Sequence, residues 1–386
     1  MKKDTLLARA GRDPAKHQGM VNTPVFRTST VLFPDLESYE ARGGDDYKKV
    51  RYGQLGTPTT FALEEAVAKM EGGHAAVALP SGLAAIAAAL CAYVKSGDHL
   101  LVPDSVYVPT RTFCDKHLKP NGVEVEYYDP LIDAAIEKRF KANTKAVFCE
   151  APGSLSFEMQ DIPAIAEAAH RRGIPVLADT TWGTPYFFRS FEKGVDVSIH
   201  AATKYIAGHS DVVMGMIVTN ERHWLTVRHA VAEYGYGVSP DDCYLALRGF
   251  RTIGVRMRQQ MENALKVARW LQAHKQVRRV IYPALEGDPG HAVWQRDFTG
   301  AASLFSFVLG AGERQATAFI NALELFGIGS SWGGFESLAI VAPIAPYRTV
   351  TKWEPGGPTI RLHIGLEDPD DLIADLERGF SAMKGA

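Results

Sequence analysis

Short apolar runs alternate with amphipathic segments along most of the chain. Apolar runs of about four to eight residues are typical of buried strands, whereas apolar residues at every third or fourth position indicate helices. Strands are predicted at 75–79, 97–103 with its leading turn, 123–128, 145–149, 174–178, 195–199 and 212–219, and helices at 84–94, 131–140 and 162–172. Strands separated by helices form crossover units, so the pattern predicts an α/β fold with a mostly parallel sheet and helices on both faces.

The two ends of the chain depart from this central pattern. The first 55 residues are rich in arginine, glycine, proline and threonine without a sustained period, so we expect them to be disordered or to form an arm that packs on something else. From about residue 241 a long helical pattern leads into a segment with shorter strand patterns. A chain of 386 residues suggests two domains. The predicted parts are an arm at 1–55, a large domain at 56–245 and a small α/β domain at 246–386 that covers a cleft.

Composition limits the possible partners. Apolar residues make up 46% of the chain and charged residues 22%, which is ordinary for a folded protein. The net charge is −2 and no dense block of lysine and arginine occurs, so a nucleic acid is not an expected partner. The N-terminus lacks the apolar run of a signal peptide, and the longest apolar stretch, 83–94, is shorter than the roughly 20 residues that a membrane-spanning helix requires. We expect no membrane contact.

Cysteine, histidine and glycine spacings narrow the choice of cofactor. The four cysteines are far apart and form no Cys-x-x-Cys pair, which is typical of reduced thiols and favours a cytoplasmic location. The histidines show no metal-ligand spacing, so no metal site is expected. No Gly-x-Gly-x-x-Gly follows the first predicted strand, which argues against a nicotinamide or flavin dinucleotide.

An aspartate and a lysine follow two neighbouring strand patterns. Asp179 ends the strand at 174–178, and Lys204 lies in the small-residue turn after the strand at 195–199. Taken alone, Lys204 would be read as a solvated surface lysine. The ends of neighbouring parallel strands share one rim of a sheet, however, and a lysine held away from water becomes a nucleophile. Pyridoxal phosphate needs this pair, because a lysine binds its aldehyde carbon and an acid keeps its ring nitrogen protonated.

The motifs around these two residues resemble a known family. The runs Ala-Thr-Lys-Tyr at 202–205, Gly-His-Ser-Asp at 208–211 and Asp-Thr-Thr-Trp at 179–182 are similar to the Cys/Met-metabolism branch of pyridoxal-phosphate enzymes, and further matches extend from about Tyr52 to the C-terminus. The resemblance implies the fold-type-I architecture of the aspartate-aminotransferase class. This comprises a large, mostly parallel seven-stranded sheet domain and a smaller α/β C-terminal domain, with pyridoxal 5'-phosphate as cofactor.

The resemblance also implies where the cofactor is held. Ser81, Gly82 and Leu83 match the phosphate cradle of the family, and a serine and glycine at the start of a helix offer free N–H groups to an anion. An ordinary helix cap is the simpler interpretation of that turn by itself. Thr203, next to the lysine, is expected to contact the cofactor as well. Tyr107, just past a strand end, matches the tyrosine that stacks on the cofactor ring.

The N-terminal arm carries one departure from the family. The resemblance implies that this arm reaches a neighbouring subunit of a homotetramer, with Tyr52 near the neighbour's cofactor. The family usually has a phosphate-binding arginine two positions later, where this chain has Gln54. Losing a charge-assisted bidentate contact costs roughly 1.5 to 3 kcal/mol. Either Arg51 or a nearby lysine at 48 or 49 replaces the arginine, or the backbone cradle suffices without it.

Two C-terminal segments suggest the substrate. Arg361 lies in an alternating strand pattern, where a lone arginine usually faces solvent, but the matching family arginine binds the α-carboxylate of the substrate. The run Ser-Trp-Gly-Gly-Phe-Glu-Ser begins at Ser331 and is similar to the β-lyase branch of the family, whereas the γ-lyase and sulfhydrylase relatives usually have a leucine in place of Trp332. A structural tryptophan is the alternative interpretation of this residue.

The resemblance implies an activity as well as a fold. We expect a carbon–sulfur β-lyase that cleaves an amino-acid thioether, L-cystathionine, to homocysteine, pyruvate and ammonia. Lys204 is the expected general base, and Tyr107 and Tyr52 are expected to assist proton transfer or to hold the ring. The alternatives are a cysteine desulfhydrase, γ-lyase, γ-synthase or sulfhydrylase of the same family. A catalytically silent, cofactor-binding regulatory protein is the alternative from another class, because Gln54 weakens the phosphate site.

Overall fold

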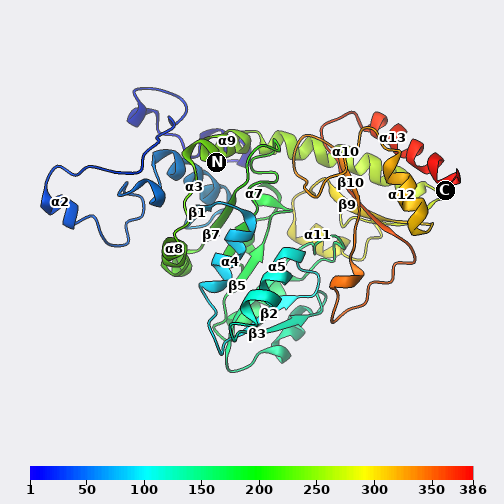
Figure 1. The fold of residues 1–386 in the computed structure, drawn as a ribbon, viewed down its shortest axis with the longest axis horizontal. Coiled ribbons are helices and arrows are strands. Elements are labelled where there is room, and N and C mark those ends of the chain that lie inside the picture. The colour runs from blue at the N-terminus through cyan, green and yellow to red at the C-terminus, as the bar shows by residue number, and fades with distance from the viewer. Residues whose placement is uncertain (386) are drawn as a thin grey trace.

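A seven-stranded sheet forms the centre of the larger part of the chain in the computed structural model, which describes residues 1–385 (Figure 1). Its strands, in spatial order, are β1 (Ala75–Leu79), β7 (Gly215–Thr219), β6 (Val197–His200), β5 (Val176–Asp179), β4 (Thr144–Glu150), β2 (His99–Pro103) and β3 (Glu124–Tyr128). The strands from β6 to β3 are parallel, and β7 runs antiparallel to both of its neighbours. The predicted mostly parallel, seven-stranded sheet is therefore confirmed.

Helices cover both faces of this sheet, so the strands have apolar residues on both sides. Val77 and Leu79 of β1 pack in the same core cluster as residues of α4 (Gly82–Cys91), while Ala76 belongs to a second cluster with α3 (Pro58–Glu71) and α6 (Ile162–His170). All residues of β1, β2, β6 and β7 are buried. Continuous apolar strands are expected when both faces of a sheet are covered, which explains the short apolar runs in the sequence.

A smaller antiparallel sheet follows in the C-terminal part. Its strands, in spatial order, are β10 (Leu338–Val341), β11 (Thr359–His363), β9 (Leu304–Leu309) and β8 (Val277–Ile281). The helices of this part are α10 (Ile253–Ala273), α11 (His291–Asp297), α12 (Glu313–Asn321) and α13 (Pro369–Ala382). Figure 1 shows the small sheet beside the large one, with the long α10 running from one part to the other.

Two helix predictions differ from the structure. The pattern at 131–140 forms a 3-10 helix at Asp133–Arg139 rather than an α-helix, and its first residue has a φ of +48°, outside the helical region. The long helical pattern that begins near residue 241 is two helices, α9 (Pro240–Arg251) and α10, because Thr252 between them leaves the helical conformation. Hydrophobic period alone does not reveal either change in backbone conformation.

The N-terminal segment contains little regular structure. It has the short helices α1 (Lys3–Arg9) and α2 (Leu36–Glu40), and Figure 1 shows α2 at the end of a long loop that projects away from both sheets. Leu7 and Ala10 pack into the main core, whereas the part around α2 is not covered within this chain, since Leu32 is 90% exposed and Leu36 is 68% exposed. The contact between this arm and a neighbouring subunit stays a prediction, as do the boundaries of the three parts.

The remaining short helices complete the larger part of the chain. They are α5 (Val108–Phe113), α7 (Thr184–Phe187) and α8 (Trp224–Glu233). Across residues 1–385, none of the helices combines the length and the apolar character needed to cross a bilayer.

Candidate active site

The carboxyl ends of β4, β5 and β6 meet at one rim of the large sheet. Asp179 is the last residue of β5 and lies opposite Ile199 of β6, which leads directly into the turn that carries Lys204. The structure therefore brings Lys204 and Asp179 to the same rim, as the strand-end rule predicts. The carboxylate is close enough to favour the charged form of the lysine, although it does not dominate the pKa of the lysine.

The amine of Lys204 is partly withdrawn from water. Burial, together with the positive charge of Arg361, lowers the pKa of Lys204 to about 8, and the charge of Asp179 opposes this shift. Lys204 Nζ donates a hydrogen bond of 2.7 Å to Ser331 Oγ and lies 5.4 Å from the centre of the Trp332 ring. An amine with this pKa has an appreciable unprotonated fraction near neutral pH, as a nucleophile or general base requires.

Asp179 is fixed by its own strand end. Its Oδ1 accepts the backbone N–H of Thr181 at 2.9 Å. Burial raises the pKa of Asp179, and the hydrogen bonds from Thr181 with the charges of His200 and Lys204 oppose that rise. A positively charged ring nitrogen next to this carboxylate would favour its ionised form for the same electrostatic reason.

Glu150 is a site residue that the sequence reasoning missed. It ends β4 and lies opposite Asp179 in the register of the sheet. Its Oε2 accepts the backbone N–H of Tyr107 at 2.8 Å, and burial together with the charge of Asp179 raises the pKa of Glu150 well above its usual value. Glu150 thus holds the Tyr107 backbone at the end of β4. The same signal that identified Asp179, a carboxylate closing an apolar strand, could have identified it.

Tyr107 lies at the same rim. It directly precedes α5, its side chain is 43% exposed, and burial together with the charges of Asp179 and Glu150 raises its pKa. The phenol is therefore protonated near neutral pH, and its ring is free to lie against a flat ligand.

The start of α4 forms a small cradle next to the lysine turn. Ser81 caps the helix, and its Oγ accepts the N–H of Ala84 at 3.1 Å. A Cβ on Gly82 would lie 2.6 Å from the Cβ of Ala201, so only glycine allows the helix start to approach this turn so closely. Leu83, in the first turn, is 39% exposed. The free N–H groups and the positive dipole end at the start of α4 suit an anion.

The hydroxyl of Thr203 is used within the chain. Thr203 Oγ1 accepts the N–H of Met214 at 2.9 Å and donates to the carbonyl of Met214 at 3.1 Å. These bonds tie the lysine turn to the segment that leads into β7. A direct contact of this side chain with the cofactor stays a prediction.

Arg361 is buried without an anionic partner. Its Nη2 donates to the carbonyls of Gly329 at 3.1 Å and Ser331 at 3.0 Å, while Nε has no hydrogen-bond partner in the described part of the chain. Among residues 1–385 no carboxylate forms an ion pair with it, although the side chain is only 5% exposed. Burial lowers its pKa to about 10. Since a buried unpaired guanidinium is costly, its position next to Lys204 favours an anion, such as a substrate carboxylate, at this place.

Tyr52 and Gln54 are not brought to this rim within one chain. Tyr52 is 48% exposed in the N-terminal segment, and the Gln54 side chain lies near Gly235 and Gly237. Of the possible replacements for the missing arginine, Arg51 donates to two carbonyls of its own segment. The structure of a single chain therefore leaves the roles of Tyr52 and Gln54 as predictions.

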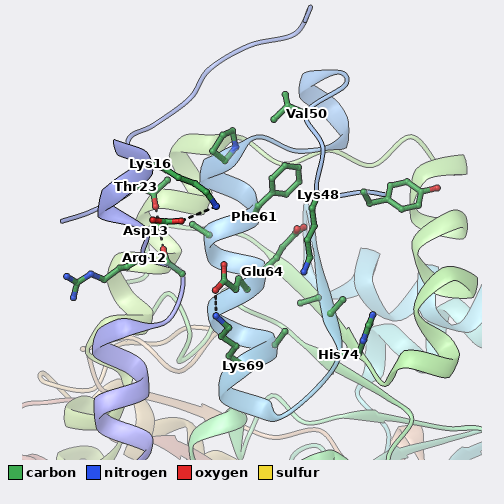
Figure 2. Close-up of a pocket in the computed structure, with 18 of the residues that line it drawn as sticks. Arg12, Asp13, Lys16, Thr23, Lys48, Val50, Phe61, Glu64, Lys69 and His74 are labelled. Carbon is green, nitrogen blue, oxygen red and sulfur yellow. Dashed lines mark hydrogen bonds and ion pairs between the residues drawn. The ribbon is translucent and has the colours of Figure 1, made fainter. Parts of the chain in front are cut away.

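A cavity of about 570 Å³ lies elsewhere. It is lined by the N-terminal segment, α3, the start of β1 and α8, and of the residues considered for the cofactor its lining includes only Lys48, one of the possible replacements for the missing arginine (Figure 2). Charged side chains line it, and some of them pair with one another, as Asp13 does with Lys16 and Glu65 with Lys69. Within the described part of the chain, no three histidine, cysteine, aspartate or glutamate side chains are grouped to hold a metal ion.

Comparison with known proteins identifies the family. The model of the Cys/Met metabolism PLP-dependent enzymes matches residues 4–381. A protein of Rhizobium johnstonii, provisionally named a cystathionine beta-lyase, is 51% identical over 98% of this chain and 96% of its own length. The cystathionine beta-lyase MetC of Escherichia coli is 43% identical over 99% of both chains. The crystal structure of metB from Corynebacterium glutamicum superposes with a TM-score of 0.90 at 30% identity and covers 99% of this chain and 98% of its own.

The chain belongs to the Cys/Met metabolism PLP-dependent enzymes. The family resemblance and the fold-type-I architecture are thereby confirmed, and pyridoxal 5'-phosphate is the cofactor. The residues present fit this group. The amine of Lys204 has a lowered pKa opposite Asp179, and glycine occupies the one position of the α4 cradle where a Cβ would collide.

Proposed function

We propose that this enzyme is a carbon–sulfur β-lyase that cleaves L-cystathionine to homocysteine, pyruvate and ammonia. The observation that carries the proposal is the contact of the Lys204 amine with Ser331, next to Trp332 and the unpaired guanidinium of Arg361. The names of the relatives from Rhizobium and Escherichia coli support the same activity.

The residues of the rim would hold the cofactor. Ser81, Gly82 and Leu83 offer the phosphate the start of α4, with Thr203 beside them. Asp179 would face the ring nitrogen and Tyr107 the ring itself. Bound there, pyridoxal phosphate supplies a protonated ring that accepts the electrons released at the substrate α-carbon.

Arg361 and Lys204 act on the substrate in this proposal. The guanidinium of Arg361 binds the α-carboxylate, because Nε has no competing partner among residues 1–385. The neutral amine of Lys204 then takes the α-proton, and its pKa of about 8 suits a base that works near neutral pH. Ser331 Oγ, 2.7 Å from Lys204 Nζ, orients this amine. Tyr107 and, from a neighbouring copy, Tyr52 are the proton donors available to the departing sulfur.

We also propose a homotetramer in which the N-terminal arm reaches a neighbouring copy. The uncovered apolar side chains of the arm support it, since Leu32 and Leu36 make little contact within their own chain. A second copy would also bring Gln54 to the neighbouring phosphate site. A cytoplasmic location is proposed on the basis of four free cysteine thiols, which suit a reducing compartment.

Identification of the products of L-cystathionine tests this function. Purified protein loaded with pyridoxal phosphate is expected to release pyruvate and homocysteine, because β-cleavage breaks the bond between sulfur and the three-carbon unit. Formation of 2-oxobutyrate and cysteine would instead make the protein a γ-lyase. Binding of the cofactor without release of thiol or ammonia would favour the silent regulatory protein.

A further inference from the structure

The turn at residues 331–334 lies directly against the lysine-bearing segment. Gly333 has a φ of +87°, and a Cβ placed on it would lie 2.9 Å from the Cα of Lys204 and 2.8 Å from the backbone nitrogen of Tyr205. The ring of Trp332 packs 5.5 Å from that of Tyr205. Only glycine allows the turn to approach the lysine-bearing segment this closely. The position of the turn therefore sets the distance between its side chains and the lysine amine.

A buried histidine connects this turn to the small sheet. The N–H of Gly333 donates to Nε2 of His363 at 3.1 Å. On the other side of the ring, Nδ1 lies 3.2 Å from Ser303 Oγ, which is itself 3.2 Å from the hydroxyl of Tyr205. A continuous chain of hydrogen bonds therefore runs from the turn, through β11 and the start of β9, to the residue that follows Lys204.

The hydrogen bonds define the protonation state of His363. The N–H of Gly333 can only donate, so Nε2 must carry a lone pair and the single ring proton lies on Nδ1, directed at Ser303. Burial lowers the pKa of His363 to about 3, so the ring stays a neutral acceptor across the physiological range. The carbonyl of Gly334 lies 3.3 Å from Nε2. In this tautomer neither atom carries a proton, so the two do not form a hydrogen bond.

His363 shares its strand with the carboxylate-binding candidate. Arg361 and His363 are two positions apart on β11, so both side chains project from the same face of the small sheet. Arg361 holds the carbonyls of Gly329 and Ser331, and His363 holds the N–H of Gly333. One strand thus fixes both ends of the turn. Gln260 of α10 adds a separate bond of 2.7 Å to the carbonyl of Gly334, so the turn keeps an anchor if His363 is replaced.

We propose that His363 is a positioning residue that holds the Ser331–Gly334 turn over Lys204 and thereby sets the affinity for the sulfur-bearing side chain of the substrate. The inference rests on the proposed function, because it names the part of the site that would distinguish thioethers. His363 touches neither of the groups assigned to the chemistry. It acts through the backbone of Gly333, which places Trp332 and Ser331.

Two replacements of His363 separate its two hydrogen bonds. His363→Asn can still reach Ser303 but is too short to reach Gly333, whereas the amide oxygen of His363→Gln lies about where Nε2 lies and can accept that N–H. We expect the asparagine variant to raise KM for L-cystathionine about tenfold with kcat within about threefold of wild type, because a buried N–H loses its acceptor. The glutamine variant is expected to restore most of the affinity.

Hydrogen exchange measures the proposed bond without any activity. In a peptide spanning 329–338, exchange at Gly333 is expected to be faster in His363→Asn than in wild type, and protected again in His363→Gln. The matched control is His99→Asn, since His99 is also fully buried and bonds to Thr144 at 2.8 Å at the start of β2. This control is expected to lower stability without changing KM or exchange at 329–338.

The outcomes separate this inference from the proposed function. Wild-type KM and wild-type exchange in folded His363→Asn would overturn the inference, and so would equal changes in His99→Asn. If the asparagine variant does not fold, Ser303→Ala removes the partner of Nδ1 and should raise KM about threefold, while an unchanged KM would count against the proposal. A wild-type protein that releases no thiol would refute the lyase activity, and the exchange comparison would still decide whether His363 holds the turn.

Discussion

Lys204→Ala is expected to reduce the rate of L-cystathionine cleavage by at least about 10⁴-fold. The substitution removes the amine that is proposed both to hold the cofactor aldehyde and to take the α-proton as a base. The structure supports this expectation because the pKa of Lys204 is lowered to about 8 in a partly buried position. The rate of pyruvate formation at saturating substrate, with cofactor supplied, is the measurement.

The matched control for this variant is Lys193→Ala. Lys193 is also partly buried and pairs with Asp297. It lies in the short 3-10 helix at Ser190–Lys193, which precedes β6, whereas the lysine turn follows β6. It should retain nearly all activity. A Lys204→Ala protein that folds with wild-type thermal stability yet keeps more than about one percent of the rate would contradict the role assigned to the amine.

Arg361→Lys is expected to lower kcat/KM for L-cystathionine about 100-fold, mostly through a higher KM. A lysine keeps the positive charge but loses the planar fork and the free Nε, so the carboxylate is bound by a single point charge. A loss of about 3 kcal/mol is typical when one partner of a buried, hydrogen-bonded charge pair is damaged. Steady-state kinetics over a range of L-cystathionine concentrations measure the effect.

Arg251→Lys provides the control for the loss of an arginine fork. Arg251 also donates to backbone carbonyls, those of Leu7 and Ala10, but it joins α9 to α1 and does not contact the lysine turn. Its replacement should change stability and leave KM unchanged. Equal KM values for Arg361→Lys and wild type would show that another group binds the α-carboxylate.

The rim of the large sheet was predictable from sequence because its features are local. A carboxylate or a lysine that follows a four-residue apolar run stays at the strand end whatever surrounds it, and neighbouring parallel strands bring such ends together. The structure accordingly places Asp179 and Lys204 at the same rim, with strands β5 and β6 within about two residues of the predicted bounds. The α4 cradle was predictable for the same reason, since Ser81 and Gly82 form a local helix start.

The small-sheet side of the site depends on register between distant segments, and here the sequence was less informative. Arg361 and Ser331 were found only through the family resemblance, because nothing in an alternating strand pattern says which face meets the lysine. His363 was missed as a positioning residue for this reason, since its partners Ser303 and Gly333 lie 60 and 30 residues away along the chain. Its burial on β11 could not be read from a lone histidine next to apolar residues.

The N-terminal arm is least predictable from one chain. Its apolar residues have no period, and its placement depends on what a second copy offers. The structure of a single chain leaves Tyr52 half exposed, and Gln54 lies against Gly237 of the same chain. The physical reason is that the part of the arm around Leu32 and Leu36 stays exposed within its own chain, so its sequence carries no internal signal of where it docks.

The most direct test of the account is the covalent labelling of Lys204. Purified protein loaded with pyridoxal phosphate is treated with borohydride, digested and examined by peptide mass spectrometry. The account predicts that the peptide containing Lys204 gains the mass of one reduced phosphopyridoxyl group and that no other lysine peptide does so stoichiometrically. An unchanged mass of this peptide in a protein that stays colourless with the cofactor would contradict the assignment of Lys204, and with it the roles proposed for Asp179 and Arg361.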